Sequence, residues 1–139
     1  MTTMFTPYLN FDGTCRDAFN FYESIIGGEL SVMANDDMPP DAQLGPEWEG
    51  RVVHASLALG EATLMGSDTP PDAPVGAISG SYVSLRLDST DDAERIFAAF
   101  ADGGEVHMPL DETFFAARFG SVVDRFGTPW MIDCEHPES

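Results

Sequence analysis

The amino-acid sequence contains an internal repeat, and this repeat constrains the fold more than any other feature. Residues 9–30 and 85–106 align without a gap at a constant offset of 76, and seven of the 22 aligned pairs are identical. The identical pairs are Leu9/Leu85, Asp12/Asp88, Thr14/Thr90, Phe21/Phe97, Gly27/Gly103, Gly28/Gly104 and Glu29/Glu105. They fall where a strand end, a helix cap, a core aromatic side chain and a helix stop are needed. The sequence therefore predicts two copies of one supersecondary unit, with any site between the copies.

The first copy has the pattern of a βαβββ unit. After an extended segment at 6–11, Thr14 is expected to cap a helix that ends at a Gly-Gly pair. The spacing i, i+3, i+4, i+7 predicts the buried face of this helix, which consists of Ala18, Phe21, Tyr22 and Ile25. Strands are predicted at 29–34, 52–59 and 62–66, with a long loop at 35–50 between the first two.

The second copy repeats this pattern. A strand is predicted at 82–87, followed by a helix that Thr90 or Ser89 caps. The buried stripe of this helix is expected to contain Ala93, Ile96, Phe97 and Phe100. Further strands are predicted at 105–109, 115–123 and 128–134.

These patterns predict an α+β fold of two tandem βαβββ modules. Their curved, mixed or antiparallel sheets are expected to enclose a shared cleft within a single domain spanning residues 1–139. Module one is placed at about 4–67, a Pro- and Gly-rich linker at 68–80 and module two at about 81–135.

Composition narrows the classes of partner and compartment. The chain of 139 residues is 43% hydrophobic and carries 24 acidic and six basic residues, a formal net charge of −18. This charge disfavours nucleic acid and anionic membranes as partners. No apolar run reaches the roughly 18 residues of a membrane helix, and the N-terminal segment lacks a signal-peptide pattern. Cys15 and Cys134 have no metal-type spacing and are expected to be reduced thiols in the cytoplasm.

Several segments resemble the vicinal oxygen chelate superfamily, which includes glyoxalase I, extradiol dioxygenases, and fosfomycin- and bleomycin-resistance proteins. Within it, the chain resembles the PhnB-like branch. The most specific segment is Asp124-Arg125-Phe126-Gly127-Thr128-Pro129-Trp130-Met131-Ile132, and weaker matches occur at 7–11, 38–39, 53–55, 67–68, 112–115 and 119–120. Members of this branch are often named ubiquinone-biosynthesis methyltransferases, but the sequence has no Gly-rich loop that would cradle a nucleotide-like cofactor.

The resemblance implies a cleft in which the superfamily's enzymes bind a divalent metal. The ligands, usually His, Gln or Glu, come from the first and last strand of each half. The matching positions in this sequence are Pro7 or Tyr8, Met65, Tyr82 and Met131. Thioether sulfur is a poor ligand for such an ion and phenol an uncommon one. We therefore predict no metal and no other cofactor. The alternative is a divalent metal held by displaced ligands, with His54 and a carboxylate among them.

Two residues are candidates for catalysis. His54, in the predicted strand 52–59, is interpreted either as a hydrogen-bond donor or general base in the cleft, or as a histidine satisfied within the sheet. Glu112 is interpreted either as a base or as a solvated acid in a turn. His107 is predicted to be structural or exposed at an edge, and His136 to be exposed in the polar tail.

Other side chains are candidates for ligand contact. Arg118 could clamp an anionic group through its guanidinium, with a surface salt bridge as the alternative. Phe114, Phe115, Phe119 and Trp130 are expected in the core or the cleft wall. The predicted ligand-binding set is Tyr8, Met65, Tyr82, Phe114, Arg118, Trp130 and Met131. A soft, apolar site of this kind suits a flat or hydrophobic small molecule.

We therefore expect a cytoplasmic protein that binds a small molecule without a metal, and the resemblance implies a homodimer. Two other functions stay open. One is a metal-dependent lyase or isomerase of the glyoxalase type, or a dioxygenase. The other is a binding protein of the bleomycin-resistance type that sequesters an antibiotic or toxin.

Overall fold

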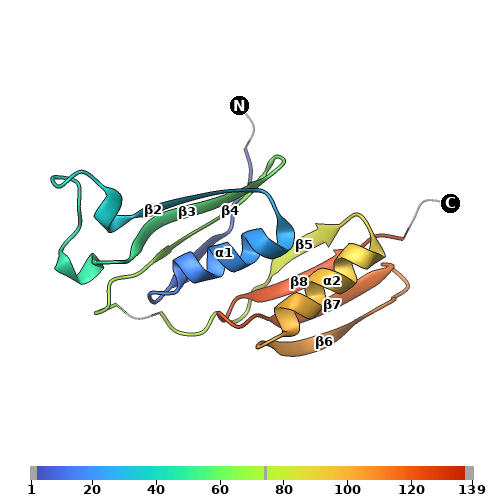
Figure 1. Cartoon of the computed structure of the whole chain (residues 1–139). Helices are drawn as coiled ribbons and strands as arrows, with labels where there is room; N and C mark the ends of the chain where they lie inside the picture. Colours follow the sequence, from blue (N-terminus) through green and yellow to red (C-terminus); the bar gives the residue numbers. More distant parts are fainter. Residues whose placement is uncertain (1–2, 74, 137–139) are drawn as a thin grey trace. The chain divides into compact units, whose positions relative to one another are not determined.

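The computed structural model describes residues 3–73 and 75–136. Residues 1, 2 and 137–139, and residue 74 of the predicted linker, lie outside the described part of the chain. Two compact units divide between Gly76 and Ala77, and we call them module one and module two. Among the described residues, each module has one α-helix and one four-stranded mixed sheet (Figure 1). The α+β architecture of two tandem βαβββ modules is confirmed.

The sheet of module one has the strand order β1-β4-β3-β2, in which β1 runs parallel to β4 and the other neighbours are antiparallel. Helix α1 packs on β2, β3 and β4 and covers one face of the sheet (Figure 1). The elements are β1 (Tyr8–Phe11), α1 (Cys15–Ile26), β2 (Glu29–Ala34), two 3-10 helices (Asn35–Asp37 and Pro46–Trp48), β3 (Val52–Leu59) and β4 (Ala62–Asp68).

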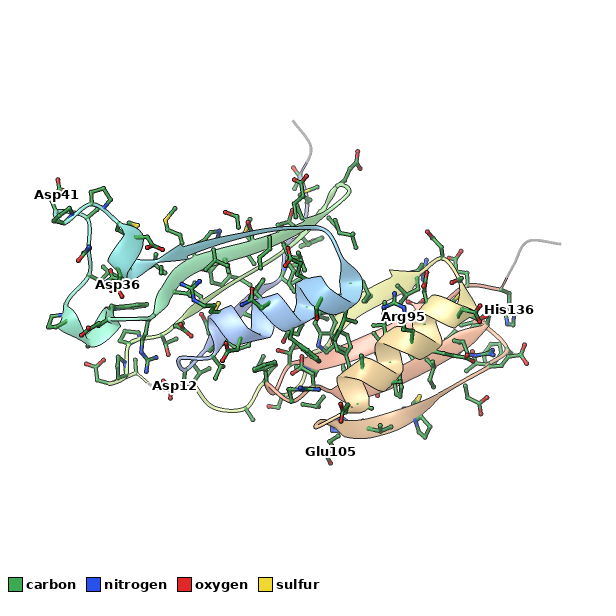
Figure 2. The ribbon with its side chains drawn as sticks, viewed as in Figure 1. Asp12, Asp36, Asp41, Arg95, Glu105 and His136 are labelled. Atoms are coloured by element: carbon green, nitrogen blue, oxygen red, sulfur yellow. The ribbon has the colours of Figure 1, made fainter. Side chains whose placement is uncertain are left out.

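Module two has the same topology, with the strand order β5-β8-β7-β6 and β5 parallel to β8. Helix α2 packs on all four strands from one side. The elements are β5 (Val83–Leu87), α2 (Thr90–Ala101), β6 (Glu105–Asp111), β7 (Arg118–Val123) and β8 (Pro129–Cys134). No helix in the described part of the chain is long and apolar enough to cross a membrane. Acidic side chains lie in both modules, as Asp36 and Glu105 illustrate (Figure 2).

The predicted strand positions are confirmed, but several boundaries differ. Strands β2 and β3 have the predicted bounds, whereas β4 extends to Asp68, two residues beyond its predicted end. Strand β7 begins at Arg118 rather than at residue 115. The reason is a turn in which the Thr113 hydroxyl accepts the backbone N–H groups of Phe115 and Ala116. These bonds hold residues 113–116 out of the ladder.

The two helices begin in different ways. Ser89 caps α2, because its hydroxyl accepts the backbone N–H of Asp92 at 3.1 Å. Thr14 occupies the cap position of α1 but makes no side-chain capping bond, which corrects its predicted role. The Cys15 backbone N–H instead donates to Oδ1 of Asp68 at 3.0 Å. The start of α1 is therefore fixed by a carboxylate from β4 and not by its own local sequence.

The buried face of α1 also differs from the prediction. Ala18 and Tyr22 are buried as expected, but Phe19 is fully buried where Phe21 and Ile25 are only half-buried. Phe19 makes edge contacts with Tyr22 and with Phe11 of β1, at ring centroid distances of 5.7 and 6.2 Å. The predicted stripe of α2 is confirmed, since Ala93, Ile96, Phe97 and Phe100 are its buried residues.

The close packing of α1 on β4 depends on Gly66. A Cβ at this position would lie 2.8 Å from both Phe19 Cε1 and the Leu9 backbone oxygen. We expect Gly66→Ala to lower the free energy of unfolding by about 1–3 kcal/mol, because the backbone of β1 has little room to yield. Chemical denaturation measures this loss. The matched control is Gly76→Ala, where a Cβ meets nothing within 4 Å. Equal stability of the two variants would contradict the packing argument.

The buried thiol of Cys15 is expected to lower the stability of module one at alkaline pH. Burial, and secondarily the Asp68 carboxylate, raise the pKa of the Cys15 thiol from 9.0 to about 12. Above pH 9 the thiol releases its proton in the unfolded state but keeps it in the folded state. Its contribution to the free energy of unfolding is therefore fully present below pH 9 and is lost as the pH rises toward 12. From pH 8 to pH 10, Cys15 should lower the free energy of unfolding by about 1.4 kcal/mol.

Urea unfolding of wild type and Cys15→Ala at both pH values measures this effect. The fall between pH 8 and pH 10 should be smaller in the variant by that amount, because every other titrating group is retained. The same pH dependence in both proteins would show that the folded thiol titrates normally.

Candidate functional site

We call the sheet surface opposite the helix the open face of each module. Side chains alternate between the two faces of a strand, and the strand register fixes which of them share a face. In module one, Leu9, Ala55 and Leu57 are buried on the helix side. The open face of module one comprises Tyr8, Asn10, Met33, His54, Ser56, Met65 and Ser67.

A tyrosine–histidine pair lies on the open face of module one. The hydroxyl oxygen of Tyr8 is 3.4 Å from Nδ1 of His54, and the two rings are tilted with centroids 5.8 Å apart. Met65 is the register partner of Tyr8, and Met33 is that of His54. Tyr8 and Met33 are each 48% exposed, and His54 is half-buried. Three of the predicted site residues, Tyr8, His54 and Met65, therefore share one accessible face.

Module two carries a second tyrosine–histidine pair. The hydroxyl oxygen of Tyr82 lies 3.2 Å from Nδ1 of His107, and both side chains are exposed. The open face of module two comprises Ser84, Arg86, Phe119, Ser121, Met131 and Asp133. The register pairs Met131 with Ser84, as it pairs Met65 with Tyr8. Ser84, and not Tyr82, is therefore the first-strand position of module two, which corrects the predicted assignment by two residues.

The four strand positions do not suit a divalent metal. They present a phenol at Tyr8, a hydroxyl at Ser84 and thioethers at Met65 and Met131. An ion of the kind implied by the resemblance needs imidazole or carboxylate ligands. No group of three or more His, Cys, Asp or Glu side chains within residues 3–73 and 75–136 is arranged to hold a metal ion. The side chains at these four positions therefore do not fit the divalent metal that the superfamily's enzymes bind.

Trp130 lies on the helix side of β8, which corrects its predicted place in the ligand site. It is 1% exposed, and its ring stacks on Phe100 of α2 with centroids 4.6 Å apart. Its indole N–H donates to Oδ2 of Asp124 at 2.8 Å. Met131, the next residue along the strand, faces the opposite side and is half-buried. Trp130 is a core residue of module two.

Arg118 is also on the helix side, where its guanidinium already has partners. Its Nε and Nη2 atoms each lie 3.1 Å from Oε1 of Glu94 on α2, and its Nη1 donates to the Ala117 backbone oxygen. This ion pair corrects the predicted anion clamp, because the guanidinium is turned away from the open face.

Glu112 belongs to an exposed loop between β6 and β7. Its Oε2 atom lies 4.0 Å from Nδ1 of His136, a residue just after β8 that Figure 2 labels. Phe114 and Phe115 follow in the same loop and are 96% and 54% exposed. The Glu112 side chain is 68% exposed, which is the environment expected of the solvated turn acid that was its alternative interpretation.

Two polar features escaped the sequence reasoning. The first is an ion pair on the open face of module two, in which Nε of Arg86 donates to Oδ2 of Asp133 at 3.1 Å. Hydrogen bonds to Asp133 and Glu135 raise the pKa of Arg86 above its usual value. Alternation along β5 and β8 could have placed both residues beside Met131.

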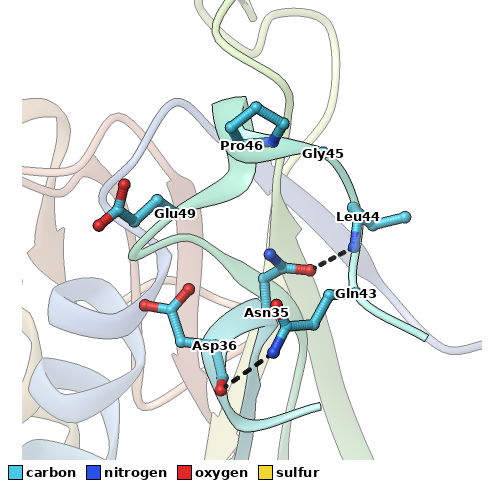
Figure 3. A pocket seen from close by; sticks show the side chains of 7 residues that line it. All are labelled: Asn35, Asp36, Gln43, Leu44, Gly45, Pro46 and Glu49. Atoms are coloured by element: carbon cyan, nitrogen blue, oxygen red, sulfur yellow. Dashed lines mark hydrogen bonds between the residues drawn. The ribbon is translucent and has the colours of Figure 1, made fainter. Parts of the chain in front are cut away.

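The second is a polar pocket of about 300 Å³ in the 35–50 loop (Figure 3). Asn35 accepts the Leu44 backbone N–H at 2.7 Å, and Gln43 donates to the backbone oxygens of Asp36 and Met38. These bonds are internal to the loop and account for its compactness. The sequence signal for such a loop is only its polar, Pro-containing composition.

Comparison with known proteins identifies the class of this fold. The family model described as the Glyoxalase/Bleomycin resistance protein/Dioxygenase superfamily matches residues 7–132. The chain therefore belongs to this superfamily. It is 35% identical over 139 residues to protein YjdN of Escherichia coli, with 92% of each chain covered.

Two solved structures are similar over nearly their whole length. Protein PA1353 from Pseudomonas aeruginosa has a TM-score of 0.88 and 43% identity, covering 98% of this chain and 100% of that one. A PhnB protein from Bacillus cereus, named as a putative 3-demethylubiquinone-9 3-methyltransferase, has a TM-score of 0.78 and 25% identity, covering 95% and 99%. The resemblance to the PhnB-like branch is confirmed.

Proposed function

We propose that this chain binds a small organic molecule on the open faces of its sheets and holds it without a divalent metal. The observation that carries the proposal is the tyrosine–histidine pair on the open face of module one, Tyr8 with His54, and module two carries a second exposed pair, Tyr82 with His107. Both histidines and both tyrosines keep exposed or half-exposed surface. Polar side chains held in this way on a sheet face can orient a ligand.

The methionines on the open faces favour an apolar or aromatic ligand. Met33 and Met65 lie in the register next to Tyr8 and His54, and Met131 lies on the open face of module two. Thioether side chains adapt their shape and contact aromatic rings favourably. A site of this composition binds by packing and is oriented by a few polar groups.

His54 is the residue we propose for any proton transfer. A Tyr8 hydroxyl that donates to Nδ1 of neutral His54 leaves the ring proton on Nε2. The imidazole then presents its Nε2 proton to the ligand as a hydrogen-bond donor. It can accept a proton at Nδ1 only after the hydrogen bond from the Tyr8 hydroxyl is broken. This arrangement supports ligand orientation more directly than it supports base catalysis.

The methyl transfer named for the Bacillus cereus protein is not part of this proposal. The segments that join β1 to α1 and β5 to α2, residues 12–14 and 88–89, contain a single glycine, Gly13. A nucleotide-like methyl donor is usually held by a glycine-rich turn at this kind of junction.

The test is a thermal-shift screen of metabolites and antibiotics, run with and without added divalent metal. We expect a stabilising ligand whose effect does not require metal. His54→Ala, which removes the imidazole, should weaken the binding of this ligand by about tenfold, as expected for loss of one orienting hydrogen bond. His136→Ala removes a histidine outside both open faces and is the matched control.

Elemental analysis of protein purified without chelator separates the alternatives. Stoichiometric zinc, nickel, manganese or iron that is lost on His54→Ala would contradict the proposal and favour a metal-dependent lyase, isomerase or dioxygenase. Conversion of the bound compound would exclude simple sequestration of an antibiotic or toxin. Binding without conversion would support a protein of the sequestering type.

We further propose that the protein is a cytoplasmic homodimer. The free thiols of Cys15 and Cys134 support the cytoplasmic location, and the resemblance to superfamily members that commonly dimerise supports the assembly. Sedimentation equilibrium at several protein concentrations tests the assembly, and a mass equal to one chain would refute it.

A further inference from the structure

One carboxylate oxygen on the open face of module two lacks a hydrogen-bond partner. Asp133 is 8% exposed, and its Oδ1 atom is buried without a partner among the described residues. Its Oδ2 atom accepts the bond from Arg86. A buried carboxylate oxygen without a donor is unfavourable. This position therefore calls for a donor that the described chain does not supply.

The sheet itself does not require this charge. Asn10 and Ser67 of module one are register partners, as Arg86 and Asp133 are in module two. They are the equivalent positions, because Tyr8/Met65 and Ser84/Met131 precede them by two residues in each module. Module one thus carries a neutral pair where module two carries ions. The carboxylate is specific to module two and points to a role other than folding.

Aromatic side chains extend away from this carboxylate. Phe119 is the register partner of Asp133 and lies on the same open face. Its ring contacts Phe115 at a centroid distance of 5.1 Å, and Phe115 contacts Phe114 at 5.2 Å. We call Phe119, Phe115 and Phe114 the aromatic row. Exposure increases along the row and reaches 96% at Phe114, so it offers apolar surface that the described chain does not cover.

We propose that Asp133 and the aromatic row form a binding site for an organic amine in its protonated form. The ammonium group would donate to Oδ1 of Asp133, and the organic part would pack on Phe119 and Phe115. An ammonium matches this site because it supplies both a donor and a positive charge near aromatic faces. The net charge of −18 also raises the local concentration of cations.

The amine reaches the carboxylate when Arg86 turns aside. Arg86 has a side chain that is 62% exposed, whereas that of Asp133 is 12% exposed. The second partner of Arg86, Glu135, is 68% exposed and can keep its ion pair with Arg86 in the new position. This inference rests on the proposed function, because the site lies on the same open face as Met131, and it adds the chemical class of the ligand.

The test compares two probes of similar shape, 2-phenylethylammonium and the neutral 2-phenylethanol. Nitrogen–proton correlation spectra of the whole chain are recorded as each probe is added. We expect the ammonium to bind at least about tenfold more tightly than the alcohol, because its bond to the carboxylate is charge-assisted. Shifts for both probes should map to residues 115–119 and 131–133.

Variants of the ion pair decide the assignment. Asp133→Ser installs the residue that module one has at this position and should abolish the preference for the ammonium. Arg86→Gln keeps Asp133 and removes the guanidinium that pairs with its carboxylate. This variant should bind the ammonium several-fold more tightly. Arg95→Gln removes the same charge from the outer surface of α2, where Figure 2 labels the residue, and should leave the binding of both probes unchanged.

The outcomes separate this inference from the proposed function. Equal binding of the two probes, a preference that survives Asp133→Ser, or unchanged binding in Arg86→Gln would overturn the amine site and leave the proposed function standing. If neither probe shifts the spectral signals of any residue on either open face, the result would count against both the amine site and the proposed function. If Asp133→Ser does not fold, Arg86→Gln alone decides the question.

Discussion

Replacing Asp124 with alanine is expected to lower the free energy of unfolding by about 3–5 kcal/mol. Asp124 is 3% exposed in the turn between β7 and β8. Its Oδ1 atom accepts the backbone N–H groups of Phe126 and Thr128, at 2.8 and 3.1 Å, and its Oδ2 atom accepts the indole N–H of Trp130. Each buried donor left without an acceptor costs about 1–3 kcal/mol. The melting temperature should fall by about 10 °C.

Urea unfolding followed by tryptophan fluorescence measures this loss. The chain has two tryptophans, so a Trp48→Phe background makes Trp130 the reporter. Asp124→Asn keeps one acceptor oxygen but places an amide N–H₂ group against the indole or the backbone donors, and its loss should be intermediate. Asp88→Ala at an exposed site is the control and should change stability by less than about 0.5 kcal/mol. A similarly small change for Asp124→Ala would show that the turn holds without its carboxylate.

The repeat predicted the architecture correctly but not the rotation of each helix. The aligned pair Phe21/Phe97 combines a half-buried residue with a buried one. The buried residues of the helices correspond at an offset of 78 rather than 76, as Cys15/Ala93, Ala18/Ile96, Phe19/Phe97 and Tyr22/Phe100. The connections that precede the helices have three and two residues, so an offset that aligns the strands does not align the buried faces of the helices. Sequence identity alone could not reveal this rotation.

Three predicted ligand-contact residues, taken from strand positions that match the superfamily, lie on the open faces, whereas Trp130 and Arg118, chosen for their chemical character, lie on the helix side. Tyr8, Met65 and Met131 lie on open faces. Trp130 and Met131 are adjacent in one strand and must face opposite sides, so alternation already excluded one of them. The ion pair of Arg118 depends instead on Glu94, a residue of α2, and helix placement of this kind is not written in local sequence.

The start of α1 shows the same limit at a single position. Thr14 and Ser89 carry similar local signals for a helix cap. Only Ser89 makes a side-chain capping bond, because Asp68 supplies the acceptor at the start of α1 from 53 residues away. A long-range contact that replaces a local one has no signature in the residues around the helix start.

Asp68→Ala is therefore expected to destabilise module one by about 2–5 kcal/mol. Asp68 is 2% exposed, and its two oxygens accept the backbone N–H of Cys15 at 3.0 Å and that of Val52 at 2.9 Å. The variant leaves both donors unsatisfied and removes a negative charge from the N-terminus of α1. Denaturation followed by far-ultraviolet circular dichroism measures the loss, and Asp72→Ala at an exposed position is the matched control.

Comparing the two helix starts tests the physical reason for this loss. Ser89→Ala should cost about 1 kcal/mol, since it removes a capping bond that the structure contains. Thr14→Ala should cost less than about 0.5 kcal/mol, because the Thr14 side chain makes no such bond. If Thr14→Ala were as damaging as Asp68→Ala, the local cap and not the distant carboxylate would be what fixes α1. A large loss confined to Asp68 would establish that β4 positions the helix of its own module.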